Sequence, residues 1–196
     1  MEKTRRAGVI AGALACFQIF AASPRAHAEE TRRSSLQVIL DNRANTPAEV
    51  LQAAQATASR IYSALGVDLM WTAASTDTAT AHRVTLVVSP HALAGATRHA
   101  LGTAIANRSS AGRRAYVYLD RVTAFANSVN SPVTSMLAHV IAHELGHLLI
   151  GHSGHAVTGL MSTQWKGAEI ERLKNGGLTF TGDHAKTIQA RLGVID

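Results

Sequence analysis

One short stretch holds most of the residues that could do chemistry. Residues 139–155 read HVIAHELGHLLIGHSGH and contain five of the ten histidines in the chain. Their core is an H-E-x-x-H pattern formed by His143, Glu144 and His147. On an α-helix, positions four apart differ by about 40° around the axis and by about 6 Å along it. Both imidazoles can therefore bind one ion, and His nitrogens are common ligands of zinc.

A buried helix is the element expected to carry this pattern. Apolar residues recur around it at helical spacing, and they are Met136, Leu137, Val140, Ile141, Leu145, Leu148 and Leu149. Burying two imidazoles and a carboxylate among them is costly unless the polar groups are paired or ligated. A metal ion is the simplest explanation, and a His-rich, partly exposed helix without a metal is the alternative. Glu144 would then take the proton of a water made acidic by zinc.

A third protein ligand is needed, because catalytic zinc usually has three protein ligands and one water. The candidates are His152, His155, Glu169 and Glu171. Gly151 can adopt a left-handed conformation, end the helix and turn the chain back. His155 has enough chain after that turn to reach the ion and is the preferred ligand, whereas His152 would need a tighter path. Either glutamate would require a second helix that crosses the first.

The rest of the chain alternates between strands and helices. Strands are expected at 35–41, 67–71, 84–88, 101–105 and 115–119, and helices at 46–65, at 132–150 and from 181. Thr46-Pro47-Ala48-Glu49 is typical of a capping box. A helix between the first two strands indicates an α+β fold with a mixed, mostly parallel twisted sheet and two long helices against it. Residues 151–177 are Gly-rich and predict a short irregular C-terminal subdomain, closed by the final helix.

The first 28 residues resemble a secretory signal peptide. Residues 1–6 are basic, residues 7–22 are apolar, and Ala26-His27-Ala28 forms an A-x-A cleavage site before Glu29. The apolar run is shorter than the roughly 20 residues of a membrane span, although an uncleaved anchor is the alternative. We therefore expect a single catalytic domain at 29–196 that is secreted or periplasmic. No later segment is expected to span, so stable membrane insertion after signal removal is not predicted.

Composition excludes several other classes of protein. Hydrophobic residues make up 46% and charged residues 16%, which excludes a disordered chain. The formal net charge is +6, and half of the basic excess lies in the signal segment. The remainder is an ordinary soluble surface, so no nucleic-acid partner is expected. The single cysteine, Cys16, also lies in the signal segment, and a metal site in the mature chain must therefore use His and carboxylates.

Other residues give weaker indications. His139 shares the His143 face one turn earlier and is expected to support the site rather than bind metal. Trp71 and Trp165 are expected in the core, with a place in the cleft as the alternative. Several arginines flank the expected strand at 101–105, namely Arg98, Arg108, Arg113, Arg114 and Arg121. They could favour acidic peptides or an anionic surface, or they could form a solvated rim.

The motif and the residues after it resemble the metzincin clan of zinc peptidases. AHELGHLLIG is followed by His155, by Gly159-Leu160-Met161 and by Trp165, as in small secreted bacterial members of the HELGH…GIM type. The resemblance covers most of residues 35–192, and its specific part is 142–165. It departs from the common pattern HExxHxxGxxH, because Ile150 takes the glycine position and Ser153 the third-His position, with His155 two residues beyond. No Tyr follows Met161, so a tyrosine that stabilises the transition state is not available there.

The resemblance implies a zincin-like fold and one catalytic Zn²⁺. The implied ligands are His143, His147 and His155. Glu144 would be the general base, and Met161 would be the Met-turn residue beneath the metal. The strand at 101–105 would be the sheet edge that pairs with an extended peptide. The function predicted is thus an exported zinc-dependent endopeptidase that acts on a peptide or protein substrate.

Two other functions stay open on the sequence. One is a gluzincin-like peptidase in which Glu169 or Glu171 is the third ligand. The other is a secreted metal-binding or envelope-interaction protein that has ligands but no turnover. Glu144 discriminates between catalysis and mere binding, because a binding site needs no general base.

Overall fold

The computed structural model describes residues 33–73, 82–106, 113–151 and 154–194, all within one compact unit, Thr31–Asp196. The expected signal peptide and His152 lie outside the described residues, and the predicted domain division stays a prediction. The elements are β1 (Ser34–Asn42), α1 (Ala48–Ser63), β2 (Val67–Ala73), β3 (Arg83–Ser89), β4 (Gly102–Ile105), β5 (Arg114–Tyr118), α2 (Leu119–Ser128), α3 (Val133–Ile150), α4 (Ala168–Lys174) and α5 (Gly182–Leu192).

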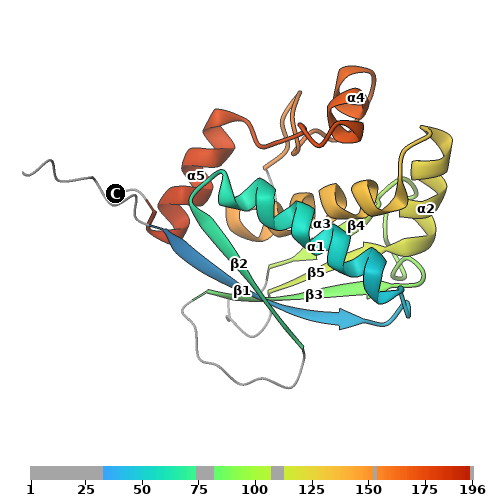
Figure 1. Ribbon diagram of the computed structural model, residues 1–196, viewed down its shortest axis with the longest axis horizontal. Coiled ribbons are helices and arrows are strands. Elements are labelled where there is room, and N and C mark those ends of the chain that lie inside the picture. The colour runs from blue at the N-terminus through green and yellow to red at the C-terminus, as the bar shows by residue number, and fades with distance from the viewer. Residues whose placement is uncertain (1–32, 74–81, 107–112, 152–153, 195–196) are drawn as a thin grey trace, which may run out of the picture. The chain divides into compact units, whose positions relative to one another are not determined.

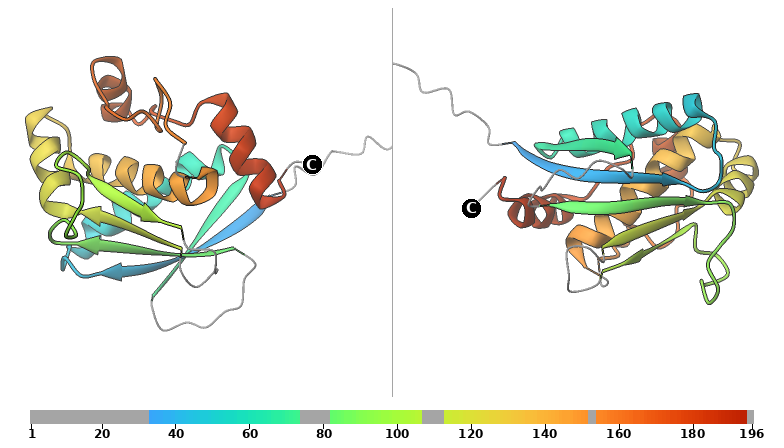
Figure 2. Two further views of the ribbon diagram at one scale, coloured as in Figure 1. Left: turned by 180° about the vertical axis from the view of Figure 1, so that it is seen from behind. Right: turned by 90° about the horizontal axis from the view of Figure 1, so that it is seen from below.

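A five-stranded sheet runs in the order β2-β1-β3-β5-β4. The first four strands are parallel, and β4 joins β5 antiparallel at the edge. In the centre, Val38 of β1 lies between Trp71 of β2 and Val84 of β3. The long helices α1 and α3 pack against each other on one face of this sheet (Figures 1 and 2). The predicted α+β class, with a mostly parallel sheet and two long helices, is confirmed.

Helix α1 covers β1 and β2 with the residues that the sequence spacing predicts. Its buried side chains are Leu51, Ala54, Ala58, Ile61 and Tyr62. The predicted capping box is wrong, because Pro47 is the N-cap and no side chain caps the helix. The Thr46 backbone is held instead by the Asn42 amide, which accepts from the Thr46 N–H and donates to its carbonyl, both at 3.0 Å. An Asx side chain at the end of β1 thus fixes the chain just before the helix, without capping the helix itself.

Helix α3 is the core helix of the protein. Twelve of its eighteen residues are buried. It has a mean hydropathy of 1.3, so by length and composition it could cross a membrane, contrary to the sequence expectation that no such segment follows the signal. However, 67% of it is buried inside the protein, as in the core helix of a globular domain. It ends at Gly151, whose φ of 108° confirms the predicted turn.

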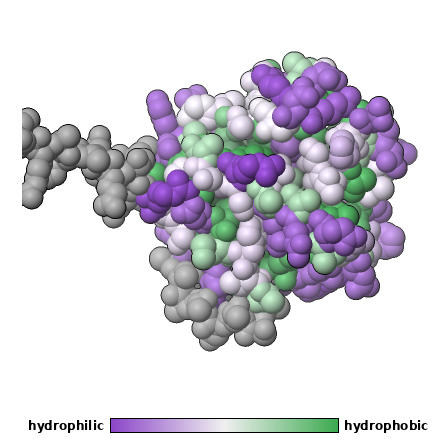
Figure 3. Space-filling view, viewed as in Figure 1, coloured by the Kyte–Doolittle hydropathy of each residue, from purple (hydrophilic) through white to green (hydrophobic). Residues whose placement is uncertain are grey.

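Two short helices, α2 and α4, are not indicated by the apolar spacing. Helix α2 begins at Leu119 directly after β5, where the alternating pattern predicts that the strand continues. Helix α4 lies in the Gly-rich region that predicts irregular chain. Figure 3 shows hydrophilic side chains gathered over α4, in keeping with the exposure of Glu171 and Arg172. The last helix, α5, matches its prediction and buries Ile188 and Leu192.

One buried hydrogen bond joins the two long helices and provides a test of this packing. The Tyr62 hydroxyl on α1 donates to the Ala142 carbonyl on α3 at 3.1 Å. We expect Tyr62→Phe to lower the free energy of unfolding by about 1 kcal/mol, because a buried hydrogen bond is lost while the ring remains. Urea unfolding measures the difference. Tyr116→Phe is the matched control, since Tyr116 is only partly buried and its hydroxyl bonds to no described residue; equal losses in both variants would contradict the prediction.

Candidate metal centre and cleft

Three imidazoles converge at the end of α3. The Nε2 atom of His147 lies 3.0 Å from Nε2 of His143 and 3.1 Å from Nε2 of His155. One ligand atom from each residue falls within 4.8 Å of the other two. His143 and His147 are partly buried on the helix, and His155 is exposed on the loop after Gly151. Such a set of nitrogens can share one small cation.

The Leu160 carbonyl orients the first imidazole. His143 Nδ1 lies 2.8 Å from this oxygen, and because a carbonyl can only accept, Nδ1 carries the hydrogen. The lone pair is then on Nε2, the atom directed at the other histidines. Burial lowers the pKa of His143 to about 3, so the ring is neutral and able to bind a metal. A backbone carbonyl on the far nitrogen is the usual support of a metal-binding histidine.

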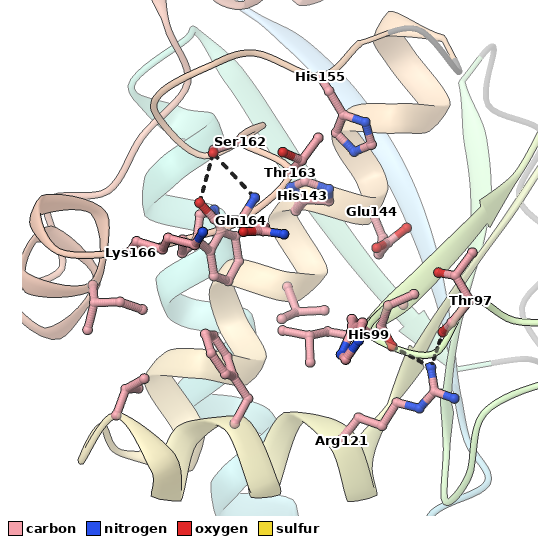
Figure 4. Close-up of a pocket in the computed structure, with 18 of the residues that line it drawn as sticks. Thr97, His99, Arg121, His143, Glu144, His155, Ser162, Thr163, Gln164 and Lys166 are labelled. Atoms are coloured by element: carbon pink, nitrogen blue, oxygen red, sulfur yellow. Dashed lines mark hydrogen bonds between the residues drawn. The ribbon is translucent and has the colours of Figure 1, made fainter.

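Glu144 lies beside the histidines, under the edge strand. The residue is only 5% exposed, and burial raises the pKa of its carboxyl to about 8. Figure 4 shows its carboxyl group on the β4 side of His143 and His155. A Cβ atom at Gly102 would lie 2.6 Å from Glu144 Cγ and 2.5 Å from the Tyr116 carbonyl. Only glycine at 102 therefore allows β4 and the carboxylate to approach this closely.

A second close contact lies on the other side of α3. A Cβ atom at Gly146 would meet Met161 Sδ at 2.7 Å and Phe180 Cε1 at 2.9 Å. Met161 is fully buried, and Phe180 in turn makes a T-shaped ring contact with Tyr62, with ring centroids 5.3 Å apart. The glycine in HELGH thus lets the Met161 segment pack directly on the helix backbone. This places Met161 next to the helical turn that joins His143 to His147.

An open cavity of about 1190 Å³ runs past these groups. The three histidines and Glu144 form part of its wall, and residues 101–104 around the edge strand form another part. Helix α2, residues 97–100, Val140, residues 162–167, Ile170 and Glu171 complete the lining. The volume is above the roughly 300–1,000 Å³ that pockets for small ligands span. The cavity is therefore large enough to hold a side chain of a bound peptide together with part of its main chain.

The other candidate ligands lie elsewhere. Glu169 pairs with Arg172 at 3.0 Å and Glu171 with Lys174 at 3.2 Å, so both carboxylates on α4 turn to cations of their own helix. Among the described residues, no carboxylate belongs to the ligand group. His152 lies outside the described residues. The structure therefore brings His155, and neither glutamate, to the two helical histidines.

His139 and the two tryptophans do not bind the metal, and of these three only Trp165 lines the cleft. His139 is fully buried, with Nδ1 at 2.7 Å from the Ser135 carbonyl, and is not in the ligand group. Trp71 donates to Ser59 at 2.9 Å and joins β2 to α1, away from the cleft. Trp165 is 9% exposed, lines the cleft and donates to the Leu160 carbonyl at 3.1 Å. Sequence reasoning does not find the roles of Leu160 and Gly102, because a carbonyl direction and a close approach leave no signal in the residue pattern.

Comparison with known proteins bears on the fold. No protein-family model and no curated protein match the chain. Archaemetzincin from Methanopyrus kandleri has a similar structure, with a TM-score of 0.51 and 14% identity, over 85% of this chain and 99% of that one. The chain has a zincin-like fold. At this identity the likeness establishes the fold alone.

A second structure is similar over a comparable part of the chain. Metalloproteinase-II from Bacteroides fragilis has a TM-score of 0.49 and 14% identity, over 84% of this chain and 55% of that protein. The chain thus spans about half the length of the Bacteroides protein.

The contact between Gly102 and Glu144 can be tested directly. We expect Gly102→Ala to lower the free energy of unfolding by about 1–3 kcal/mol, because the added methyl group overlaps two neighbours that have little room to move. Gly182→Ala is the matched control, since Cβ there meets nothing within 4 Å. Thermal unfolding of both variants measures the effect. Equal stability of Gly102→Ala and the wild type would show that β4 does not press on Glu144.

The buried carboxyl predicts a pH dependence of stability in the metal-free protein. Because folding raises the pKa of Glu144 from 4.5 to about 8, the folded state holds the proton more tightly than the unfolded state, and this contribution to stability is lost as the pH rises through that window. Glu144→Gln should therefore be more stable than the wild type at pH 8, by on the order of a few kcal/mol. At pH 4 the two should be alike. Urea unfolding in the presence of a chelator tests this, with the exposed Glu49→Gln as control, and a gain that does not vary with pH would contradict it.

Proposed function

We propose that this chain is an exported zinc-dependent endopeptidase that hydrolyses peptide bonds, with Glu144 as general base. The observation that carries the proposal is the convergence of three imidazole nitrogens beside a buried carboxylate, in the wall of an open cleft. The zincin-like fold, which the chain shares with archaemetzincin, supports it.

The donor set suits zinc. Three neutral imidazoles are the protein ligands of one known type of catalytic zinc site, which leaves a fourth position open. His143, His147 and His155 would hold the ion, and the Leu160 carbonyl would keep the His143 ring in place. When bound, zinc supplies a Lewis acid that makes water a nucleophile near neutral pH.

Glu144 is placed to move the proton. Its carboxyl has little competition from solvent, and its raised proton affinity suits a group that accepts a proton from water and passes it to the leaving amine. The edge strand β4 offers its outer main-chain groups to an extended peptide, as in β-strand addition. A peptide bound along β4 would pass over Glu144, because Gly102 lies directly against that side chain.

Export is part of the proposal and is supported by the sequence of the first 28 residues. A basic start, an apolar run and an A-x-A site are the three parts of a signal peptide. The proposed mature enzyme begins near Glu29 and acts in the periplasm or outside the cell. Its ligand set needs no thiolate, which is compatible with an oxidising compartment.

Metal analysis and proteolysis together test the proposed function. We expect the purified mature protein to hold one zinc per chain and to cleave denatured casein, and a chelator to abolish cleavage. His155→Ala should lose zinc, since two ligands remain. Glu144→Gln should keep zinc and lose on the order of 10²–10⁴-fold in rate, because only proton transfer is removed.

The control for these variants is His91→Ala. His91 is exposed, pairs with Asp120 and is not part of the cleft lining. It should change neither zinc content nor rate. Full zinc retention by His155→Ala would show that a residue other than His155 is the third ligand. A zinc-loaded wild type that cleaves no protein or peptide would favour the metal-binding protein without turnover.

A further inference from the structure

Helix α2 presents one face to the cleft. Its lining residues are Arg121, Ala124, Phe125 and Ser128, at the i, i+3, i+4 and i+7 positions of a helix. Hydrolysis as described above uses none of them. An amphipathic helix whose polar and apolar groups both face a substrate cleft is placed to select what binds there.

Arg121 is a fixed cation on this face. Its Nη1 donates to the Thr97 carbonyl at 2.7 Å and to the Ala100 carbonyl at 2.8 Å (Figure 4). Its guanidinium lies 5.4 Å from the centre of the Tyr118 ring. Carbonyl oxygens and a ring hold the group in place without cancelling its charge, and no described carboxylate pairs with it. Binding a ligand therefore costs little further conformational entropy at this side chain, because it is already ordered.

The remaining charges of the cleft leave it positive. Arg98 and Lys166 line it and pair with no described carboxylate. Glu171 also lines it, but that carboxylate pairs with Lys174. The other lining carboxyl, Glu144, is buried beneath β4. Of the arginines grouped in the sequence, Arg98 and Arg121 thus reach the cleft.

The other arginines of that group do not serve the cleft. Arg113 donates to the Leu148 carbonyl at 2.6 Å at the end of α3. Arg114 is exposed on β5 and is not part of the cleft lining. Arg108 lies outside the described residues. The arginines that are close in the sequence therefore do not form one cluster. Only Arg98 and Arg121, which line the cleft, bear on the choice of ligand.

Apolar side chains from several elements also line the cleft. Phe125 on α2, Val140 on α3 and Ile170 on α4 face it from three helices, and Trp165 joins them. Val140 lies one helical turn before His143 and Glu144, so this apolar chamber is next to the reacting groups. An apolar side chain gains free energy by entering such a chamber, in proportion to the area that it buries.

We infer that the cleft binds peptides in which a bulky apolar side chain stands close to an acidic one. The apolar side chain fills the chamber formed by Phe125, Val140 and Ile170, and the carboxylate meets Arg121 and Arg98. This inference rests on the proposed function, because it names the substrate class of the same site. Arg121 acts as a specificity-determining residue, since its guanidinium is held in place and its remaining N–H groups can donate hydrogen bonds to a carboxylate.

Binding to an inactive protein tests the inference apart from turnover. The probes are short fluorescent peptides that all contain one Phe. Each peptide also carries a single Glu, Gln or Lys, placed in turn at each position on either side of the Phe. Zinc-loaded Glu144→Gln is titrated with each, and anisotropy gives the Kd. At the best position we expect Glu to bind about three- to tenfold more tightly than Gln and Lys to bind more weakly still. The preference should shrink at high salt, because screening weakens the charge pair.

Charge variants on the same background identify the cations. Arg98→Glu should reduce the preference for Glu or turn it toward Lys, and this side chain makes no hydrogen bond to a described residue that folding would miss. Arg121→Gln removes the positive charge and should also reduce the preference. Arg60→Glu is the matched control, because it makes the same charge change on exposed α1 outside the cleft lining. It should leave the preference intact.

The outcomes separate the two proposals. Equal Kd values for Glu and Gln at every position, or a preference that Arg60→Glu alters as much as Arg98→Glu does, would overturn the inference. Cleavage of casein by the wild type in that case would leave the proposed function standing. A Glu preference in binding with no cleavage by the wild type would support the ligand class and contradict hydrolysis.

Discussion

The hydrogen bonds to the Leu160 carbonyl hold the two parts of the site together. This oxygen accepts from His143 on α3 and from Trp165 on the segment beyond it. The first bond selects the ring nitrogen that faces the other histidines, and the second keeps the loop against the cleft. The loop is further tied by the Ala156 N–H, which donates to the Met161 carbonyl at 3.0 Å, and by the Leu160 N–H, which donates to Thr179 at 2.8 Å. His155 is thus held by a loop whose own main chain is bonded at both ends.

Two glycines let other segments come close enough to α3 for this arrangement. Gly146 admits Met161 and Phe180 to the helix backbone on one side. Gly102 admits Glu144 beneath the edge strand on another. In both places the missing side chain is what permits the contact, because a Cβ would stand closer than 3 Å to its neighbour. The carboxylate, the histidines and the edge strand can therefore share a small volume without strain in the helix.

Much of this could be predicted from residue spacing. His143 and His147 share a helix face because they are four residues apart, and Gly151 ends that helix because its conformation suits glycine. The placement of His155 required only a turn and enough chain. The start of α1 could not be predicted in the same way, since no side chain caps this helix and the Asn42 amide holds the Thr46 backbone just before it. Helix α2 could not be predicted, because Leu119 continues the alternating pattern of β5. The face that α2 turns toward the cleft depends on tertiary packing.

The three histidines differ in how far they are exposed to solvent. Two of them belong to a buried helix with most of its side chains in the core, and the third is an exposed residue on a loop. Assembly of the full set therefore has to immobilise one side chain rather than three, which keeps its entropic cost low.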